Sequence, residues 1–104
     1  MNRDKYILLY SNIGLYCDTY DTYEEAYAMM KIEFEKSKES IQKEYDQYQM
    51  IWFINECTTK TAILETLDGK FSIKWKIVKL TKKGQIVELP LFIKEKSKRK
   101  NERE

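Results

Sequence analysis

Two runs of alternating apolar and polar residues flank the pair Asp68-Gly69, and this pattern constrains the fold more than any other feature of the chain. Aspartate followed by glycine supplies the positive φ angles of a two-residue type I′ turn, so the pattern predicts a β-hairpin over Thr61–Leu80. Counting outward from Leu67 opposite Lys70 fixes the register and assigns each side chain to a face. The apolar face collects Ala62, Leu64, Phe71, Ile73, Trp75 and Ile77.

The opposite face of this hairpin is polar with a basic tint, and we expect it to face solvent. It carries Thr61, Ile63, Glu65, Ser72, Lys74 and Lys76. In this register Ala62 lies opposite Trp75 and Leu64 lies opposite Ile73, so the small alanine leaves room for the indole ring.

A helix start is encoded by Thr22 and Glu25, which form a T-x-x-E capping box. In such a box the threonine hydroxyl and the glutamate carboxylate each accept a backbone N–H, so the helix is predicted to begin at Tyr23. Apolar and aromatic residues then recur mostly at spacings of three and four, which predicts an amphipathic helix of about six or seven turns. This stripe comprises Tyr23, Ala26, Tyr27, Met30, Phe34, Ile41, Tyr45 and Tyr48.

Four further segments have the patterns of regular structure. Lys5–Ser11 is apolar on both alternating faces, so we expect a strand inside a sheet, and Gly14–Tyr20 is expected to return as a second strand. The apolar run Met50–Ile54 fits either a buried strand or the last turns of a helix, and it has to be buried or form an interface. A last strand is predicted over Gln85–Ile93, with Pro90 marking an edge or a break.

These segments together predict a single α+β domain over residues 1–93. We expect a mainly antiparallel sheet of about four or five strands, with one long amphipathic helix packed on one face, in ββα-β-hairpin order. Residues 94–104 contain no apolar side chain and are predicted to form a basic, disordered tail.

The residue types in the chain argue against catalysis. The absence of histidine excludes Ser–His and Cys–His nucleophile systems and removes the commonest zinc ligand. Cys17 and Cys57 lie in no C-x-x-C pair, so we expect two free, reduced, buried thiols and no metal site. The glycines stand singly at turns and form no phosphate-binding loop. We therefore expect no enzyme activity, no catalytic residue and no cofactor.

The chain lacks the apolar segments that direct a protein to membranes. No run reaches the ~18 to 20 apolar residues that a membrane span requires, and the first residues do not read as a signal peptide. Two unpaired cysteines also fit a reducing compartment. We therefore expect a cytoplasmic protein without a membrane partner.

A net charge of +2 hides an asymmetry between the two halves of the chain. Residues 1–50 carry 6 Lys/Arg and 10 Asp/Glu, net −4, whereas residues 51–104 carry 13 and 7, net +6. Acidic groups among aromatics can compete for a basic, nucleic-acid-binding groove on a partner protein. The alternative is that these acids only cap the helix and complement its dipole. The candidate partner-binding residues are Tyr16, Asp18, Tyr20, Asp21 and Glu24.

The basic half supports an alternative function, the binding of nucleic acid. Its candidate residues are Lys70, Lys74, Lys76, Lys98, Arg99 and Lys100. Single-strand binders place aromatic rings among such basic residues, but the predicted register sends Phe71 and Trp75 to the opposite face of the hairpin. A lysine-covered face and a charged tail are also typical of a solubilising surface.

Residues 21–80 carry two motifs, DTYEEAYAMMKIEFEK and TKTAILETLDGKFSIKWKIVKL. In these motifs the chain resembles a loose group of small accessory proteins of Gram-positive bacteria, their phages and plasmids, which share a capped helix and a later hairpin. Some accessory proteins of this size from mobile genetic elements are anti-CRISPR or other anti-defence inhibitors. The resemblance implies a non-catalytic macromolecule-binding module that blocks a surface of a host protein.

Overall fold

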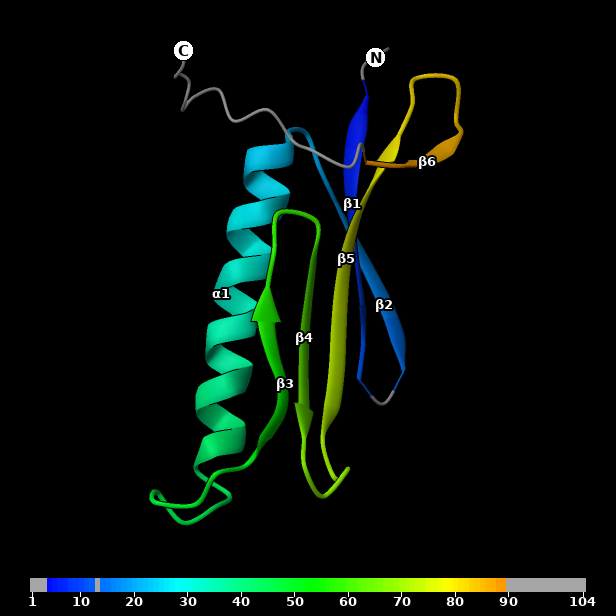
Figure 1. The fold of residues 1–104 in the computed structure, drawn as a ribbon. Helices are drawn as coiled ribbons and strands as arrows, with labels where there is room; N and C mark the ends of the chain where they lie inside the picture. The colour runs from blue at the N-terminus through cyan, green and yellow to red at the C-terminus, as the bar shows by residue number, and fades with distance from the viewer. Residues whose placement is uncertain (1–3, 13, 90–104) are drawn as a thin grey trace, which may run out of the picture.

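The fold combines one helix with six strands, which confirms the predicted α+β class. The structure, a computed structural model, describes residues 4–12 and 14–89. Helix α1 runs alongside the strands for most of their length (Figure 1). In chain order the elements are β1 (Lys5–Ser11), β2 (Leu15–Tyr20), α1 (Tyr23–Gln42), β3 (Trp52–Cys57), β4 (Thr61–Thr66), β5 (Ser72–Leu80) and β6 (Ile86–Glu88).

The strands form one antiparallel sheet in the order β2-β1-β5-β4-β3, and β6 also pairs with β5. The mainly antiparallel sheet is therefore confirmed. It has six strands rather than four or five, because the apolar segment that the sequence left open becomes strand β3. Strand β1 lies between β2 and β5, inside the sheet, as the apolar character of both its faces predicts.

The β4–β5 hairpin has the predicted register, with Ala62 opposite Trp75 and Leu64 opposite Ile73. All four of these side chains are buried. The last two members of the predicted apolar face also join the core. Ile77 is buried in it, and Phe71 is partly buried and packs against it. Alternation along the sequence thus correctly identifies which face of the hairpin joins the core.

The turn of this hairpin differs from the predicted type I′ turn. Gly69 has a φ of +73°, but no non-glycine residue in the described part of the chain has a positive φ, so Asp68 lacks the conformation that type I′ requires. Residues 67–70 instead form a four-residue loop, closed by the Thr66 N–H donating to the Phe71 carbonyl at 3.0 Å. The Asp68 carboxylate stabilises this longer loop, because it accepts the Lys70 N–H at 2.9 Å.

Helix α1 begins at Tyr23 behind the predicted capping box, with the Glu25 N–H donating to the Thr22 hydroxyl at 3.1 Å. It ends at Gln42, so the predicted length of six or seven turns, reaching Tyr48, is wrong. Tyr45 lies in the following loop, where its hydroxyl donates to Asp68 at 2.8 Å. The helical spacing of Tyr45 therefore reflects a contact with the hairpin turn and not a further helical turn.

Trp75 lies at the centre of the core and is 1% exposed. Its ring meets Phe34 of α1 edge-on, with centroids 5.9 Å apart, and stacks on Tyr10 of β1 at 5.9 Å. The indole N–H donates to Glu33 Oε1 at 3.2 Å, which satisfies its polar atom. The buried residues of α1 that join the same core cluster are Ala26, Met30, Phe34 and Ile41.

The two segments that flank the β4–β5 hairpin depart from the sequence expectations. In the run Met50–Ile54, Ile51 is buried, but Met50 is 81% and Phe53 is 64% exposed. A β-bulge between Trp52 and Ile54 interrupts the alternation there. The last strand spans Ile86–Glu88 only, and the rest of its predicted range, like the predicted tail, lies outside the described residues.

Both cysteines are free, but they are less buried than expected. Cys17 is exposed because it lies on the edge strand β2, and Cys57 of β3 is partly buried. Burial raises the pKa of the Cys57 thiol. Among the described residues, no helix is both long enough and apolar enough to cross a membrane.

Candidate protein-binding site

Alternation along β2 brings three of the five candidate partner-binding residues to one face of the strand. Tyr16, Asp18 and Tyr20 lie opposite Tyr10, Leu8 and Tyr6 of β1, respectively. The β1 residues pack in or against the core beneath α1, so this face of β2 is turned toward the helix. Asp18 is exposed, and Tyr20 is partly buried against the core.

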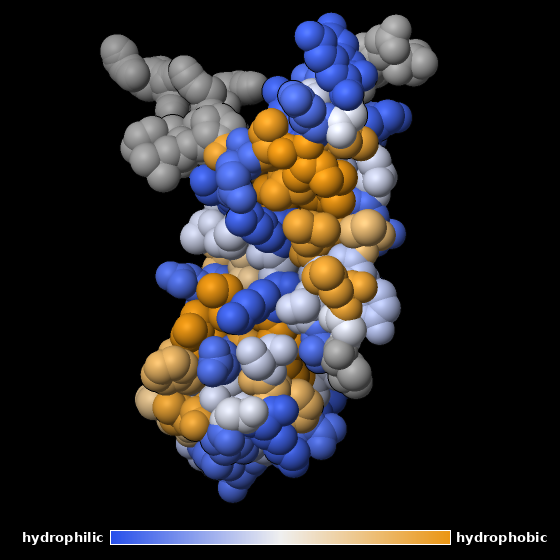
Figure 2. Space-filling model, turned by 90° about the vertical axis from the view of Figure 1, so that its right-hand side faces the viewer, coloured by the Kyte–Doolittle hydropathy of each residue, from blue (hydrophilic) through white to orange (hydrophobic). Residues whose placement is uncertain are grey.

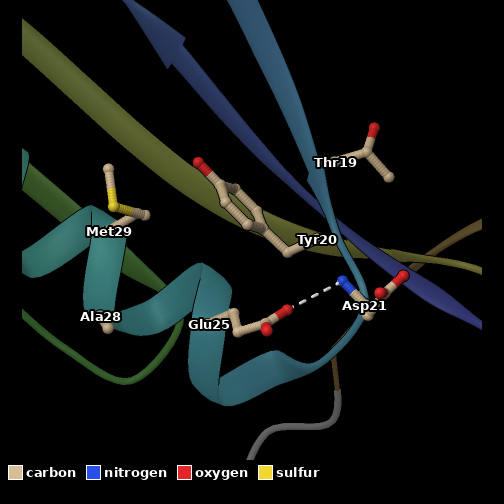
Figure 3. Close-up of a pocket in the computed structure, with 6 residues that line it drawn as sticks. All are labelled: Thr19, Tyr20, Asp21, Glu25, Ala28 and Met29. Atoms are coloured by element: carbon tan, nitrogen blue, oxygen red, sulfur yellow. Dashed lines mark hydrogen bonds between the residues drawn. The ribbon is translucent and has the colours of Figure 1, made fainter.

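Helix α1 presents an acidic flank to this strand. Glu25, Met29 and Glu33 are spaced four residues apart and therefore share one side of the helix. Glu25 and Met29 line a hollow of about 470 Å³ between α1 and the end of β2. Figure 3 shows the Tyr20 ring between the strand and the helix, with its hydroxyl pointing toward Met29. The hollow is lined by Thr19, Tyr20, Asp21, Glu25, Ala28 and Met29.

Negative charge surrounds the Tyr20 hydroxyl. Burial raises the pKa of this hydroxyl, and the negative charges of Asp18 and Glu33 raise it further. Both carboxylates are therefore close enough to Tyr20 to act on it electrostatically. We call Asp18, Tyr20, Glu25, Met29 and Glu33 together the β2–α1 site.

The remaining two candidates, Asp21 and Glu24, contribute less to this arrangement. The Asp21 carboxylate forms an ion pair with Lys5 at 2.7 Å, and Figure 3 shows it pointing away from the Tyr20 ring. The Asp21 backbone N–H donates to Glu25 Oε1 at 3.1 Å, which holds the helix start against the end of β2. Glu24 is exposed in the first turn of α1 and does not line the hollow.

Tyr16 lies farther down β2 and is 53% exposed. Its ring contacts Tyr10 with centroids 5.3 Å apart, and Tyr10 in turn stacks on Trp75. A row of aromatic rings thus connects an exposed position on β2 with the centre of the core. Tyr16 can therefore offer apolar surface and a hydroxyl to a partner while its ring stays in contact with Tyr10.

Three residues of the β2–α1 site, Glu25, Met29 and Glu33, were not among the predicted binding residues, although Glu25 was recognised as an acidic residue of the helix start. The spacing of these residues, four apart from Glu25, was a readable signal. It could not be assigned a function without knowing that this flank of α1, and not the opposite one, lies beside β2. No group of three or more acidic or cysteine side chains among residues 4–12 and 14–89 is arranged to hold a metal ion.

The candidates for nucleic-acid binding are dispersed. Lys74 is exposed on the sheet face turned away from α1, but Lys76 beside it is ion-paired with Glu88 at 2.8 Å, which lowers the pKa of Glu88. The Lys70 ammonium lies 5.9 Å from the centre of the Phe71 ring at the hairpin loop. Lys98, Arg99 and Lys100 lie outside the described residues. Since Trp75 is buried, the hairpin offers no indole to stack on a base.

A second exposed apolar surface lies at the opposite end of the molecule from the helix start. Its members are Tyr48, Met50, Phe53 and Leu67, all more than half exposed. Met50 and Leu67 line a small hollow of about 120 Å³ together with Tyr45 and Asp68.

Comparisons with known proteins identified no relative of this chain. A scan against protein-family models gave no match, and searches of curated proteins and of solved structures gave none either.

Proposed function

We propose that the protein is a non-catalytic binding module whose β2–α1 site receives a basic segment of a partner protein. One observation carries this proposal: Tyr20 of β2 and Glu25 of α1 line one hollow between the two elements. Asp18 lies on the same face of β2 as Tyr20, and Glu33 lies one turn beyond Met29 on the same side of α1. None of the six residues that line the adjoining hollow is basic. The site therefore combines negative charge with aromatic and thioether surface, which suits a lysine or arginine side chain.

The distribution of charge on α1 also supports a basic partner. Glu25 and Glu33 lie on the flank beside β2, whereas Lys31, Glu35 and Lys38 act on the Cys57 thiol of β3, on the other flank. The side chains that line the hollow on the β2 flank thus include Glu25 and no basic residue, whereas the β3 flank carries both signs of charge. Negative charge around the hollow increases the rate of association with a basic surface.

Basic surfaces that bind nucleic acid are the partners that this chemistry fits best. A protein that occupies such a surface blocks the nucleic acid by competition and needs no catalytic residue. This mode of action agrees with the anti-defence inhibitors, including anti-CRISPR proteins, found among the small accessory proteins that the sequence resembles. We therefore favour inhibition of a host nucleic-acid-binding protein as the biological role.

A binding experiment with an arginine-rich nine-residue peptide tests the proposal. We expect fluorescence anisotropy to show binding at low salt that weakens as salt is added, because the charges on the site are screened. The double variant Asp18→Asn, Glu33→Gln should weaken binding by about tenfold, equivalent to about 1.4 kcal/mol. Glutamine at position 33 can still accept the Trp75 indole N–H, so the core contact is preserved.

The matched control removes two other carboxylates of the same helix. Glu35→Gln, Glu39→Gln makes the same change in net charge outside the residues of the β2–α1 site, and Glu35 forms a surface ion pair with Lys38 at 3.6 Å. We expect this variant to bind the peptide nearly as well as the unmodified protein. Equal losses in both double variants, or no peptide binding at low salt, would rule out a specific site between β2 and α1.

A further inference from the structure

Strand β2 is an unprotected edge of the sheet. It is the last strand on its side, and all six of its residues pair with β1 without a register shift. Leu15 is 74% and Tyr16 is 53% exposed. Figure 2, which views the molecule from the side of β2 and β6, shows apolar side chains in two areas separated by a hydrophilic band. A regular edge strand with apolar side chains is a template for pairing with another strand.

Strand β3, at the opposite end of the strand order from β2, is protected. A β-bulge between Trp52 and Ile54 interrupts its ladder, and Asn55 and Glu56 follow at once. Bulges and charged residues are the usual means by which a sheet edge avoids pairing with other chains. Strand β2 has neither a bulge nor a proline nor a lysine, and Asp18 is its only charged residue.

Hydrogen-bond alternation shows which backbone groups of β2 point outward. On the β4–β5 ladder, the Ile77 N–H donates to the Lys60 carbonyl and the Thr66 N–H to the Phe71 carbonyl. Odd-numbered residues of β5 therefore direct their backbone groups to β4, and even-numbered residues direct theirs to β1. The β1–β5 and β4–β5 ladders contain no register shift, so the alternation is continuous across the sheet.

The same alternation continues through β1. Since even-numbered β5 residues pair with odd-numbered β1 residues, the even-numbered β1 residues bond to β2 through Tyr16, Asp18 and Tyr20. The Asn12 N–H that donates to the Gly14 carbonyl at 3.0 Å fits this pattern. The N–H and C=O groups of Leu15, Cys17 and Thr19 therefore point away from the sheet.

We propose that two copies of the chain pair antiparallel through β2, about a two-fold axis that passes between the two Cys17 residues. This register uses all three outward-pointing residues, because Leu15 lies opposite Thr19 of the partner subunit and Cys17 opposite Cys17 of the partner subunit. Tyr16 then lies opposite Asp18 of the partner subunit, and a phenol O–H can donate to that carboxylate.

Charge selects this register over its neighbour. A shift toward the helix end of the strand would place Asp18 opposite Asp18 of the partner subunit, and like charges in a cross-strand pair are destabilising. A shift the other way shortens the ladder. Since only five of the six residues of β2 pair in this register, the interface is small, and we expect a weak dimer with a dissociation constant in the micromolar range or above.

The pairing extends the sheet across both subunits and leaves the two α1 helices on the same face. The two β2–α1 sites then lie on either side of the joined β2 strands. The dimer rests on backbone geometry and edge residues alone, so it does not depend on the proposed function of the β2–α1 site. The two proposals can fail separately. Peptide binding by a protein that stays monomeric would contradict only the dimer, and a dimer that does not bind the peptide would contradict only the binding site.

A cysteine cross-link tests the register directly. In this register the two Cys17 residues form a hydrogen-bonded pair, in which the Cα atoms lie about 5.5 Å apart, within disulfide range. In the full-length chain with Cys57→Ser, we expect the mild oxidant copper phenanthroline to yield a disulfide-linked dimer through Cys17. The control carries Cys17→Ser, Cys57→Ser and Thr19→Cys, and it should cross-link at least tenfold more slowly because position 19 faces Leu15 of the partner subunit.

Sedimentation experiments on reduced protein complete the test. The Cys17→Lys variant places two like charges opposite each other and should raise the dimer dissociation constant at least tenfold, whereas Cys17→Ser should leave it within about threefold. Both side chains point into solvent at this exposed position, so circular dichroism should show folded protein in each case. A monomer at all concentrations up to about 1 mM, equal cross-linking at positions 17 and 19, or a dimer insensitive to Cys17→Lys would each overturn the proposal.

Discussion

The two longest hairpins of this protein share antiparallel geometry but use their side chains in opposite ways. In the β4–β5 hairpin every second residue is buried from Ala62 to Thr66 and from Ile73 to Ile77, and the loop at its tip is held by several hydrogen bonds. In the β1–β2 hairpin the outer strand has no buried residue and is exposed as far as Thr19. The β4–β5 hairpin therefore uses its side chains to build the core, whereas aromatic and acidic side chains of β2 remain accessible to partners.

The largest expected effect concerns the core face of the β4–β5 hairpin. Trp75→Ala should destabilise the protein by about 3 to 5 kcal/mol, because it removes a fully buried indole and its packing against Phe34 and Tyr10. Lys74→Ala, one residue away on the exposed face, should change the free energy of unfolding by less than about 0.5 kcal/mol. Urea denaturation of both variants measures the difference. Similar small effects would mean that the two faces are not distinct.

The glycines at the two hairpin tips give a smaller, matched test. Gly69 has a φ of +73°, so Gly69→Ala should cost about 1 to 2 kcal/mol of left-handed strain, although no atom lies within 4 Å of the added Cβ. At Gly14, the added Cβ would lie 3.3 Å from the Tyr16 hydroxyl, the far end of an exposed side chain. We expect Gly14→Ala to change stability by at most about 0.5 kcal/mol. Thermal unfolding midpoints compare the two, and a larger loss at Gly14 would contradict the contrast.

The smallest effect is a pH dependence that belongs to the β4–β5 loop. The Lys70 N–H and the Thr66 and Tyr45 hydroxyls donate to the Asp68 carboxylate and lower its pKa below the usual 3.8. The contribution of the charged form is therefore complete above the unfolded-state pKa and is lost as pH falls through the folded-state pKa. The stability difference between the unmodified protein and Asp68→Asn should be constant from pH 7 to about pH 5.

Below about pH 4 that difference should shrink, because the unmodified protein also loses its charge at position 68. Denaturant titrations of both proteins at pH 7 and pH 3 measure this change. A difference that stays the same at both pH values would show that the hydrogen bonds, and not the charge, stabilise the loop.

The sequence allowed the β4–β5 register and the start of α1 to be predicted because both depend on neighbours along the chain. Thr22 and Glu25 cap the helix across three residues, and Ala62 meets Trp75 by counting from a turn. The prediction of a type I′ turn was wrong because the Asp68 carboxylate accepts hydrogen bonds from residues outside a two-residue turn, including Tyr45. The predicted end of the helix was wrong for a related reason. Tyr45 has the spacing of a helical residue in the sequence, but it lies beyond the helix and contacts the β4–β5 loop.

The candidate site was predictable only in part. Alternation places Tyr16, Asp18 and Tyr20 on one face of a strand, and this much follows from the sequence. That Glu33 joins them depends on which flank of α1 lies beside β2, which is a contact between elements. Asp21 looked equivalent to Asp18 in the sequence, but its ion pair with Lys5 is formed across the β1–β2 hairpin.

The row of rings from Tyr16 through Tyr10 to Trp75 gives the protein an optical reporter of its own. Tyrosine excitation can pass to a nearby indole, and the indole of Trp75 donates its N–H to Glu33 of the β2–α1 site. Only one other tryptophan, Trp52, contributes emission, and Trp52→Phe would remove it. In that variant, a ligand that engages Glu33 changes the polarity around a single buried fluorophore. Binding at the surface then becomes visible as a shift in the emission of the core, without a label.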